Sequence, residues 1–141
     1  MRAVNESTYL LRPIGYVRST LTDRAVAPKQ GAEAGTEAVV EILPELRQGL
    51  SGLGEGDDCF VLTWLHQGER TTLRVHPRDD TRNPLTGVFA TRSADRPNPI
   101  GLHRVSILAI ESNGRLRVRG LEAIDGTPVV DIKPVLSWER R

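Results

Sequence analysis

The residues best suited to chemistry lie between positions 87 and 102, where the sequence reads GVFATRSADRPNPIGL. This stretch carries Arg92, Arg96 and Asn98, and a proline stands on each side of the asparagine. Proline fixes its own φ angle and restricts the residue before it, so the segment forms a stiff loop. A stiff loop loses little conformational entropy when it binds. We therefore expect these three side chains to recognise a small polar ligand.

A second unusual segment, DGTPVVDIKP, covers residues 125–134. An Asp-Gly turn precedes a strand in which Asp131 and Lys133 lie on one face, where an ion pair is the structural alternative to a site. Two shorter polar clusters are Pro28-Lys29-Gln30 and His66-Gln67. Each cluster alone is typical of ordinary surface, but together with the two longer segments they become candidate binding residues.

Length and charge restrict the possible function classes. The 141 residues can bury the core of one domain, so we predict a single domain over 1–141, with a core of about 12–136 and no extra C-terminal domain. The net charge of +1 lacks the excess that drives non-specific nucleic-acid binding. RNA contacts would have to be local, and the arginine-rich stretch 69–104 offers Arg74, Arg78 and Arg82.

The compartment of the protein and its lack of a metal can be predicted from the segments and residue types in the sequence. It has no apolar run of signal-peptide length and none near the roughly 20 residues of a membrane span, so we expect a cytoplasmic protein without membrane contact. The single cysteine, Cys59, lies in an apolar run that indicates a buried thiol. The histidines His66, His76 and His103 are far apart without a second cysteine, so we expect no metal.

Periodicity favours a mainly β domain that forms a barrel rather than an alternating α/β sheet. Residues 104–121 predict a β-hairpin because their two strands flank an Asn-Gly turn. Alternation of polar and apolar residues predicts another strand, with one wet face, over residues 70–76. The remaining predicted elements are strands over 37–43 and 59–65, a short helix within 44–53, and loops over 20–36 and 77–86.

The segments 87–102 and 125–134 together resemble the TsaA-like (TrmO) family, and the resemblance runs from about Ile14 to Lys133. It implies a small antiparallel β-barrel with one or two short helices. It also implies a homodimer that binds S-adenosyl-L-methionine between its subunits. Assigned members methylate N6 of the threonylcarbamoylated adenosine at position 37 of tRNA, so tRNA is the partner that the resemblance implies.

The resemblance also implies the site residues. The chain departs from the family pattern at Lys29, where arginine is usual, at Ala94-Asp95, and at residues 135–138. The cofactor contacts implied by the matching positions are Pro28, Lys29, Gln30, His66, Gln67, Arg92, Arg96, Asn98, Leu102, Asp125, Gly126, Thr127 and Pro128.

Methyl transfer from a sulfonium is an in-line displacement, so alignment of the reactants is the main catalytic task. If an amine nitrogen accepts the methyl group, His66 or Asp125 can take its proton. Arg74, Arg78 and Arg82 would hold phosphates of an anticodon loop. Two alternatives are a methyltransferase acting on a small amine or thiol and a non-catalytic module that binds S-adenosyl-L-methionine.

Overall fold

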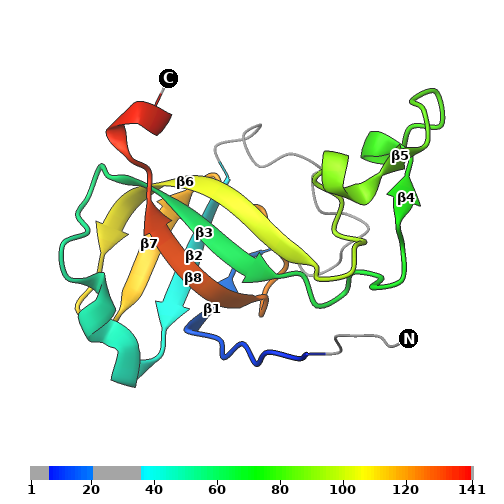
Figure 1. The fold of residues 1–141 in the computed structure, drawn as a ribbon. Coiled ribbons are helices and arrows are strands. Elements are labelled where there is room, and N and C mark those ends of the chain that lie inside the picture. The colour runs from blue at the N-terminus through cyan, green and yellow to red at the C-terminus, as the bar shows by residue number, and fades with distance from the viewer. Residues whose placement is uncertain (1–6, 21–35, 141) are drawn as a thin grey trace.

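Six antiparallel strands close into a barrel in the order β1-β2-β7-β6-β3-β8 (Figure 1). The computed structural model describes residues 7–20 and 36–140. Closure pairs the two edges of the sheet with each other, which removes a route to aggregation. The predicted small antiparallel barrel is confirmed. The barrel strands are β1 (Gly15–Arg18), β2 (Glu37–Ile42), β3 (Asp58–Trp64), β6 (Ile100–Ile110), β7 (Arg115–Arg119) and β8 (Pro128–Pro134).

Alternate residues of the strands fill the barrel interior. On β2 and β7, for example, Val40, Leu116 and Val118 are buried while their neighbours face outward. β-branched side chains suit this pleated, half-buried geometry. Cys59 of β3 is fully buried, which confirms the predicted buried thiol, and this burial raises its pKa to about 11.

The strands predicted from periodicity over 37–43 and 59–65 are confirmed as β2 and β3. The predicted hairpin is β6 and β7, closed by a hydrogen bond from the Glu111 amide to the Arg115 carbonyl, 2.9 Å long. The ion pair considered on β8 forms, since Lys133 Nζ lies 3.2 Å from Asp131 Oδ2.

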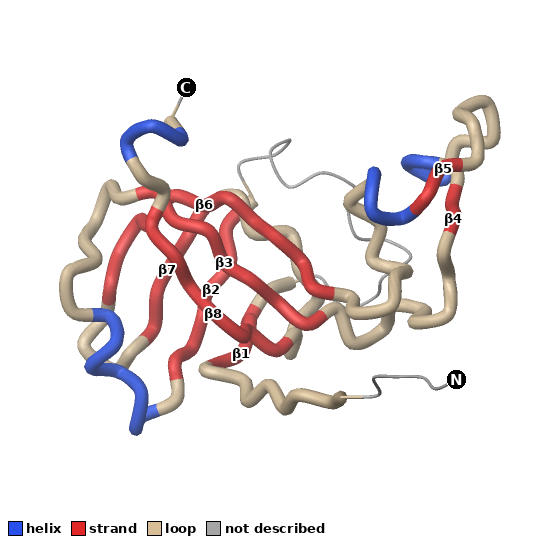
Figure 2. The backbone as a smooth tube through the Cα atoms, viewed as in Figure 1, coloured by secondary structure: helices blue, strands red, loops and turns tan. Residues whose placement is uncertain are grey.

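The predicted strand over residues 70–76 is wrong. Only Arg74–Val75 forms a strand, β4, and it pairs with β5 (Thr86–Gly87) in a separate two-stranded sheet. Figure 2 shows this sheet projecting away from the barrel, and we call residues 70–92 the arm. Alternation alone does not supply a partner strand, and Leu73 is left 64% exposed. The loop predicted over 77–86 contains a 3₁₀ helix, η3 (Pro77–Asp79).

Strand β1 was not predicted, because a four-residue strand beginning with glycine gives little periodic signal. The helix predicted within 44–53 is a 3₁₀ helix, η2 (Pro44–Leu50). Two further 3₁₀ helices, η4 (Val88–Ala90) and η5 (Ser137–Glu139), span three residues each. No helix in the described parts of the chain is long and apolar enough to span a membrane.

Candidate functional site

The barrel topology brings segments far apart in sequence to one end of the barrel. Strand β3 ends at Trp64, which pairs with Ile100 at the start of β6. On the other side of β3, Thr63 pairs with Val129 at the start of β8. Residues 66–67, Leu102 and the turn 125–128 therefore lie around the same end, which we call the site end.

The turn at Asp125 is fixed by the end of β1. The Ser19 amide donates to Asp125 Oδ1 at 3.0 Å, and the Gly126 amide donates to the Val17 carbonyl at 2.7 Å. Thr127 is buried, and its hydroxyl donates to the Ile124 carbonyl at 2.6 Å. Because the side chain of Asp125 remains exposed, the turn presents an anchored carboxylate at the site end.

The loop from Thr91 to Pro99 leads into β6 and is organised from within by Arg96. The Arg96 guanidinium donates to the carbonyls of Val88, Thr91 and Ser93, at 2.9, 3.0 and 2.9 Å. These hydrogen bonds define the loop shape, so Arg96 acts here on the loop backbone. Whether it also contacts a ligand stays a prediction.

A second set of contacts ties this loop to the segment after β3. Arg70 Nε donates to the Pro97 carbonyl at 2.8 Å, and Nη2 donates to Asn98 Oδ1 at 3.0 Å. The same guanidinium lies 5.1 Å from the centre of the Trp64 ring, within cation–π range. Arg70 was assigned to a predicted strand, so its role in the site was missed.

The loop and the turn after β3 also approach closely at Gly68. A Cβ atom on this glycine would lie 2.3 Å from the Ala94 carbonyl oxygen, so only glycine allows this contact. The neighbouring Glu69 amide donates to Asp95 Oδ1 at 2.8 Å. His66 and Gln67, in the same turn, have exposed side chains at the site end.

A polar group inside the barrel underlies this surface and was missed in the sequence. His103 Nε2 and Thr63 Oγ1 lie 2.9 Å apart and share a hydrogen bond. Gly101 leaves room for this pair, because a Cβ there would lie 2.4 Å from Thr63 Oγ1. Burial, and then the positive charge of Arg92, lower the pKa of His103 to about 4, so the imidazole is neutral at pH 7.

The alternation along β6 could have placed His103 inside, because Gly101, Val105 and Ile107 share its inward face. Leu102 lies on the opposite, outer face of β6 and is 42% exposed. Arg92 also has an exposed side chain. The site end therefore combines a guanidinium, a carboxylate and an apolar wall with a neutral polar interior.

The arginines predicted to contact RNA lie on the arm. Arg82 forms a two-point ion pair with Asp80, with Nη2 to Oδ2 at 2.8 Å, and this pairing lowers the pKa of the Asp80 carboxyl. Arg74 and Arg78 are exposed. Pro28, Lys29 and Gln30 lie outside the described residues. Among the described residues, no three histidine, cysteine, aspartate or glutamate side chains are grouped to hold a metal.

Comparison with known proteins places this geometry in a family. A protein from Methanothermobacter thermautotrophicus named "probable S-adenosyl-L-methionine-binding protein" is 48% identical over 124 residues, which cover 88% of each chain. An Archaeoglobus fulgidus protein named "S-adenosyl-L-methionine-binding protein" is 44% identical over 88% of this chain and 87% of its own.

Solved structures agree with these sequence relatives. A crystal structure of TrmO from Pseudomonas aeruginosa superposes with a TM-score of 0.77 at 32% identity and covers 99% of this chain. This chain spans 60% of the length of that protein. The family model described as the tRNA-methyltransferase O N-terminal domain matches residues 16–138. The chain therefore belongs to the TrmO family.

Proposed function

We propose that the chain is an S-adenosyl-L-methionine-dependent methyltransferase that methylates N6 of the threonylcarbamoylated adenosine at position 37 of tRNA. The observation that carries the proposal is the convergence of residues 66–67, Leu102, 125–128 and the loop 91–99 at one barrel end. Relatives named for S-adenosyl-L-methionine binding support the cofactor. We propose that this activity is cytoplasmic, because the chain belongs to a tRNA-modifying family.

The residues at the site end fit the chemical groups of this cofactor. A carboxylate of the ligand calls for a cation such as Arg92, and an ammonium or ribose hydroxyl calls for an acceptor such as Asp125. An adenine calls for an apolar wall, which Leu102 provides at the surface. These residues, together with amides of the turn 125–128, would hold the cofactor.

S-adenosyl-L-methionine supplies an electrophilic methyl group on a sulfonium. As the acceptor nitrogen forms its bond to carbon, the carbon–sulfur bond breaks and the nitrogen must lose one proton. His66 and Asp125 are exposed at the site end and are the candidates to accept that proton. The stiff loop 91–99 would exclude water and keep the acceptor aligned.

The acceptor is tested by incubating the protein with methyl-labelled S-adenosyl-L-methionine and each of three substrates. These are tRNA carrying threonylcarbamoyladenosine, the same tRNA without that modification, and a mixture of small amines and thiols. Labelling of the first alone is expected. Labelling of the small molecules alone would contradict the tRNA acceptor, and tight cofactor binding without transfer to any of them would indicate a non-catalytic module.

The arm provides one set of tRNA contacts in this proposal. Arg74, Arg78 and Arg82 would bind phosphates of the anticodon loop. Reversing their charge should raise the apparent KM for tRNA while leaving cofactor affinity unchanged. An unchanged KM would contradict these contacts.

We also propose a homodimer in which the arm contacts the second subunit. The arm exposes three large apolar side chains, with Phe89 82%, Leu73 64% and Leu85 45% accessible. Exposed apolar patches of this kind are typical of interaction sites, and a two-fold contact would let one subunit complete the site of the other. Sedimentation should show a dimer that Phe89→Glu converts to a monomer with weaker cofactor binding. A monomeric wild-type protein that binds the cofactor fully would contradict it.

A further inference from the structure

A ladder of charged side chains covers the outer face of β1, β2 and β7. The strand register places Glu41 opposite Arg115, and Glu37 opposite Arg119. Between them, Val39 pairs with Arg117 on one side and with Arg18 on the other. Because side chains alternate along a strand, all of these project outward together. We call Arg18, Arg47, Arg115, Arg117 and Arg119 the arginine face.

Few carboxylates neutralise these arginines. Glu41 bridges Arg18, at 2.9 Å from Nε, and Arg115. Glu37 lies between Arg117 and Arg119, with nitrogen–oxygen distances of 3.5 and 3.9 Å. The only other carboxylate paired with these arginines in the described residues is Glu111, 3.5 Å from Arg115 Nε.

Each guanidinium carries five N–H donors, so one or two contacts per arginine leave donors for an outside ligand. Arg18, Arg117 and Arg119 are about half exposed, with side-chain accessibilities of 51%, 46% and 52%. Exposed ion pairs such as these contribute little to stability. The face therefore combines surplus positive charge with accessible donors.

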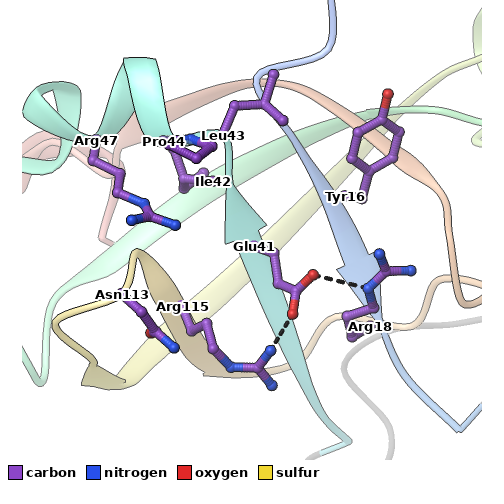
Figure 3. A pocket seen from close by; sticks show the side chains of 9 residues that line it. All are labelled: Tyr16, Arg18, Glu41, Ile42, Leu43, Pro44, Arg47, Asn113 and Arg115. Atoms are coloured by element: carbon purple, nitrogen blue, oxygen red, sulfur yellow. Dashed lines mark hydrogen bonds and ion pairs between the residues drawn. The ribbon is translucent and has the colours of Figure 1, made fainter.

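A hollow of about 320 Å³ lies within this face (Figure 3). Arg18 from β1, Arg115 from β7 and Arg47 from η2 all line it, so cations from three separate elements converge. Glu41 stands between Arg18 and Arg115 in Figure 3, and Tyr16 and Asn113 lie at the sides. A guanidinium can donate two parallel hydrogen bonds to a phosphate, which offers several acceptor oxygens. Three arginines with a single carboxylate in the lining therefore suit a phosphate group.

The arginine face is continuous with the site end. Arg18 is followed by Ser19, whose amide holds Asp125 in place. A second hollow, of about 300 Å³, joins Arg18 and Ser19 to Arg117. Successive outward residues on a strand are roughly 6.6 Å apart, a spacing similar to that of successive phosphates in a nucleic-acid chain. A polyanion lying along the face would thus reach the site end.

We propose that the arginine face binds the phosphodiester backbone of the RNA substrate and leads it to the site end. This inference rests on the proposed function, because it takes RNA as the methyl acceptor. The face adds a binding surface on the barrel to the contacts proposed on the arm. RNA binding by this face would not depend on the RNA sequence, since phosphate contacts position a nucleic acid without reading its bases.

The test measures tRNA binding by fluorescence anisotropy over a range of salt concentrations, for the full chain and for the double variant Arg117→Gln, Arg119→Gln. Loss of two phosphate contacts should lower the slope of log K against log salt by about 1.4 and weaken binding about 25-fold at 0.1 M salt. Arg47→Gln, which removes a cation outside the strands, should lower the slope by about 0.7.

Arg104→Gln is the matched control, because Arg104 is an exposed arginine of β6 that contacts the Glu139 carbonyl and Asp58. It should leave the salt slope unchanged, and all variants should bind S-adenosyl-L-methionine as the wild type does. Slopes unchanged in both arginine-face variants would overturn the inference while leaving the proposed function intact. A wild type that transfers methyl groups only to small molecules and binds no tRNA would overturn both.

Discussion

Arg70 is expected to hold the loop 91–99 in place, and replacing it tests how the site is organised. The change Arg70→Met keeps most of the aliphatic stem and removes the guanidinium. It deletes the hydrogen bonds to the Pro97 carbonyl and to Asn98 Oδ1 and the contact with the Trp64 ring. Together these contacts join the loop, through Arg70, to the end of β3. Their loss therefore acts on the loop rather than on the barrel.

The size of the effect follows from these contacts. A hydrogen bond contributes a net 0.5–1.5 kcal/mol, roughly, and an exposed cation–π contact about 0.5–1 kcal/mol. Because Arg70 is exposed, we take values at the lower limits, which sum to about 1.5 kcal/mol. The loop should then open about 12-fold more often, since about 1.4 kcal/mol corresponds to a factor of ten.

Native-state hydrogen exchange measures this opening directly. The amides of Ser93 and Asp95 donate to side-chain oxygens within the loop, so they exchange when it opens. Their exchange should be about 12-fold faster in Arg70→Met, while amides of β3 keep their rates. Arg82→Met, which removes an ion pair confined to the arm, is the control. Unchanged loop exchange, or equal acceleration in β3, would refute the assigned role of Arg70.

Three further predictions concern the barrel. The folded pKa of His103, about 4, lies below its ordinary 6.5, so the unfolded chain binds more protons between these values and stability falls as pH drops. Urea unfolding should show about 2 kcal/mol less stability from this residue at pH 5 than at pH 7, and His103→Gln should flatten the profile; equal profiles would contradict a buried neutral imidazole. Cys59, with a pKa of about 11, should react with a thiol reagent at pH 8 at least 100-fold more slowly than in denaturant, and rapid native labelling would contradict its burial. Gly101→Ala should cost about 1–3 kcal/mol by crowding Thr63 and His103, and adding Thr63→Ala should recover part of that loss; strictly additive effects in a double-mutant cycle would argue against the clash.

The sequence was most informative where a pattern has a local cause. The alternation in β7 and the Asn-Gly turn before it predict the hairpin, since both depend on neighbouring residues. The same alternation over 70–76 predicts a seven-residue strand of which only Arg74–Val75 forms, because a strand also needs a partner and β5 offers only two residues. Strand β1 was missed for the converse reason, since β2 and β8 supply its pairing from distant parts of the chain.

The site was predicted in part. The motif residues that converge at the site end were named from the sequence, although their contacts with a ligand stay predictions. Arg70, Thr63 and His103 could not be named, because their importance depends on tertiary contacts with the loop 91–99 and with the barrel interior. The arginine face could not be predicted from the sequence either, since only the barrel register brings Arg18 level with Arg117 and joins Arg18 and Arg115 through Glu41.

Calorimetric titration with S-adenosyl-L-methionine tests the central claim, that the site end binds this cofactor, most directly. The wild-type protein should bind saturably. Arg92→Ala should weaken binding strongly, because it removes the exposed cation near His103 that would pair with the carboxylate of the cofactor. Arg104→Ala, which removes an arginine of β6 that pairs with Asp58, should bind as the wild type does. Absence of binding by the folded wild-type protein, or equal affinity in Arg92→Ala, would contradict the assignment of the site.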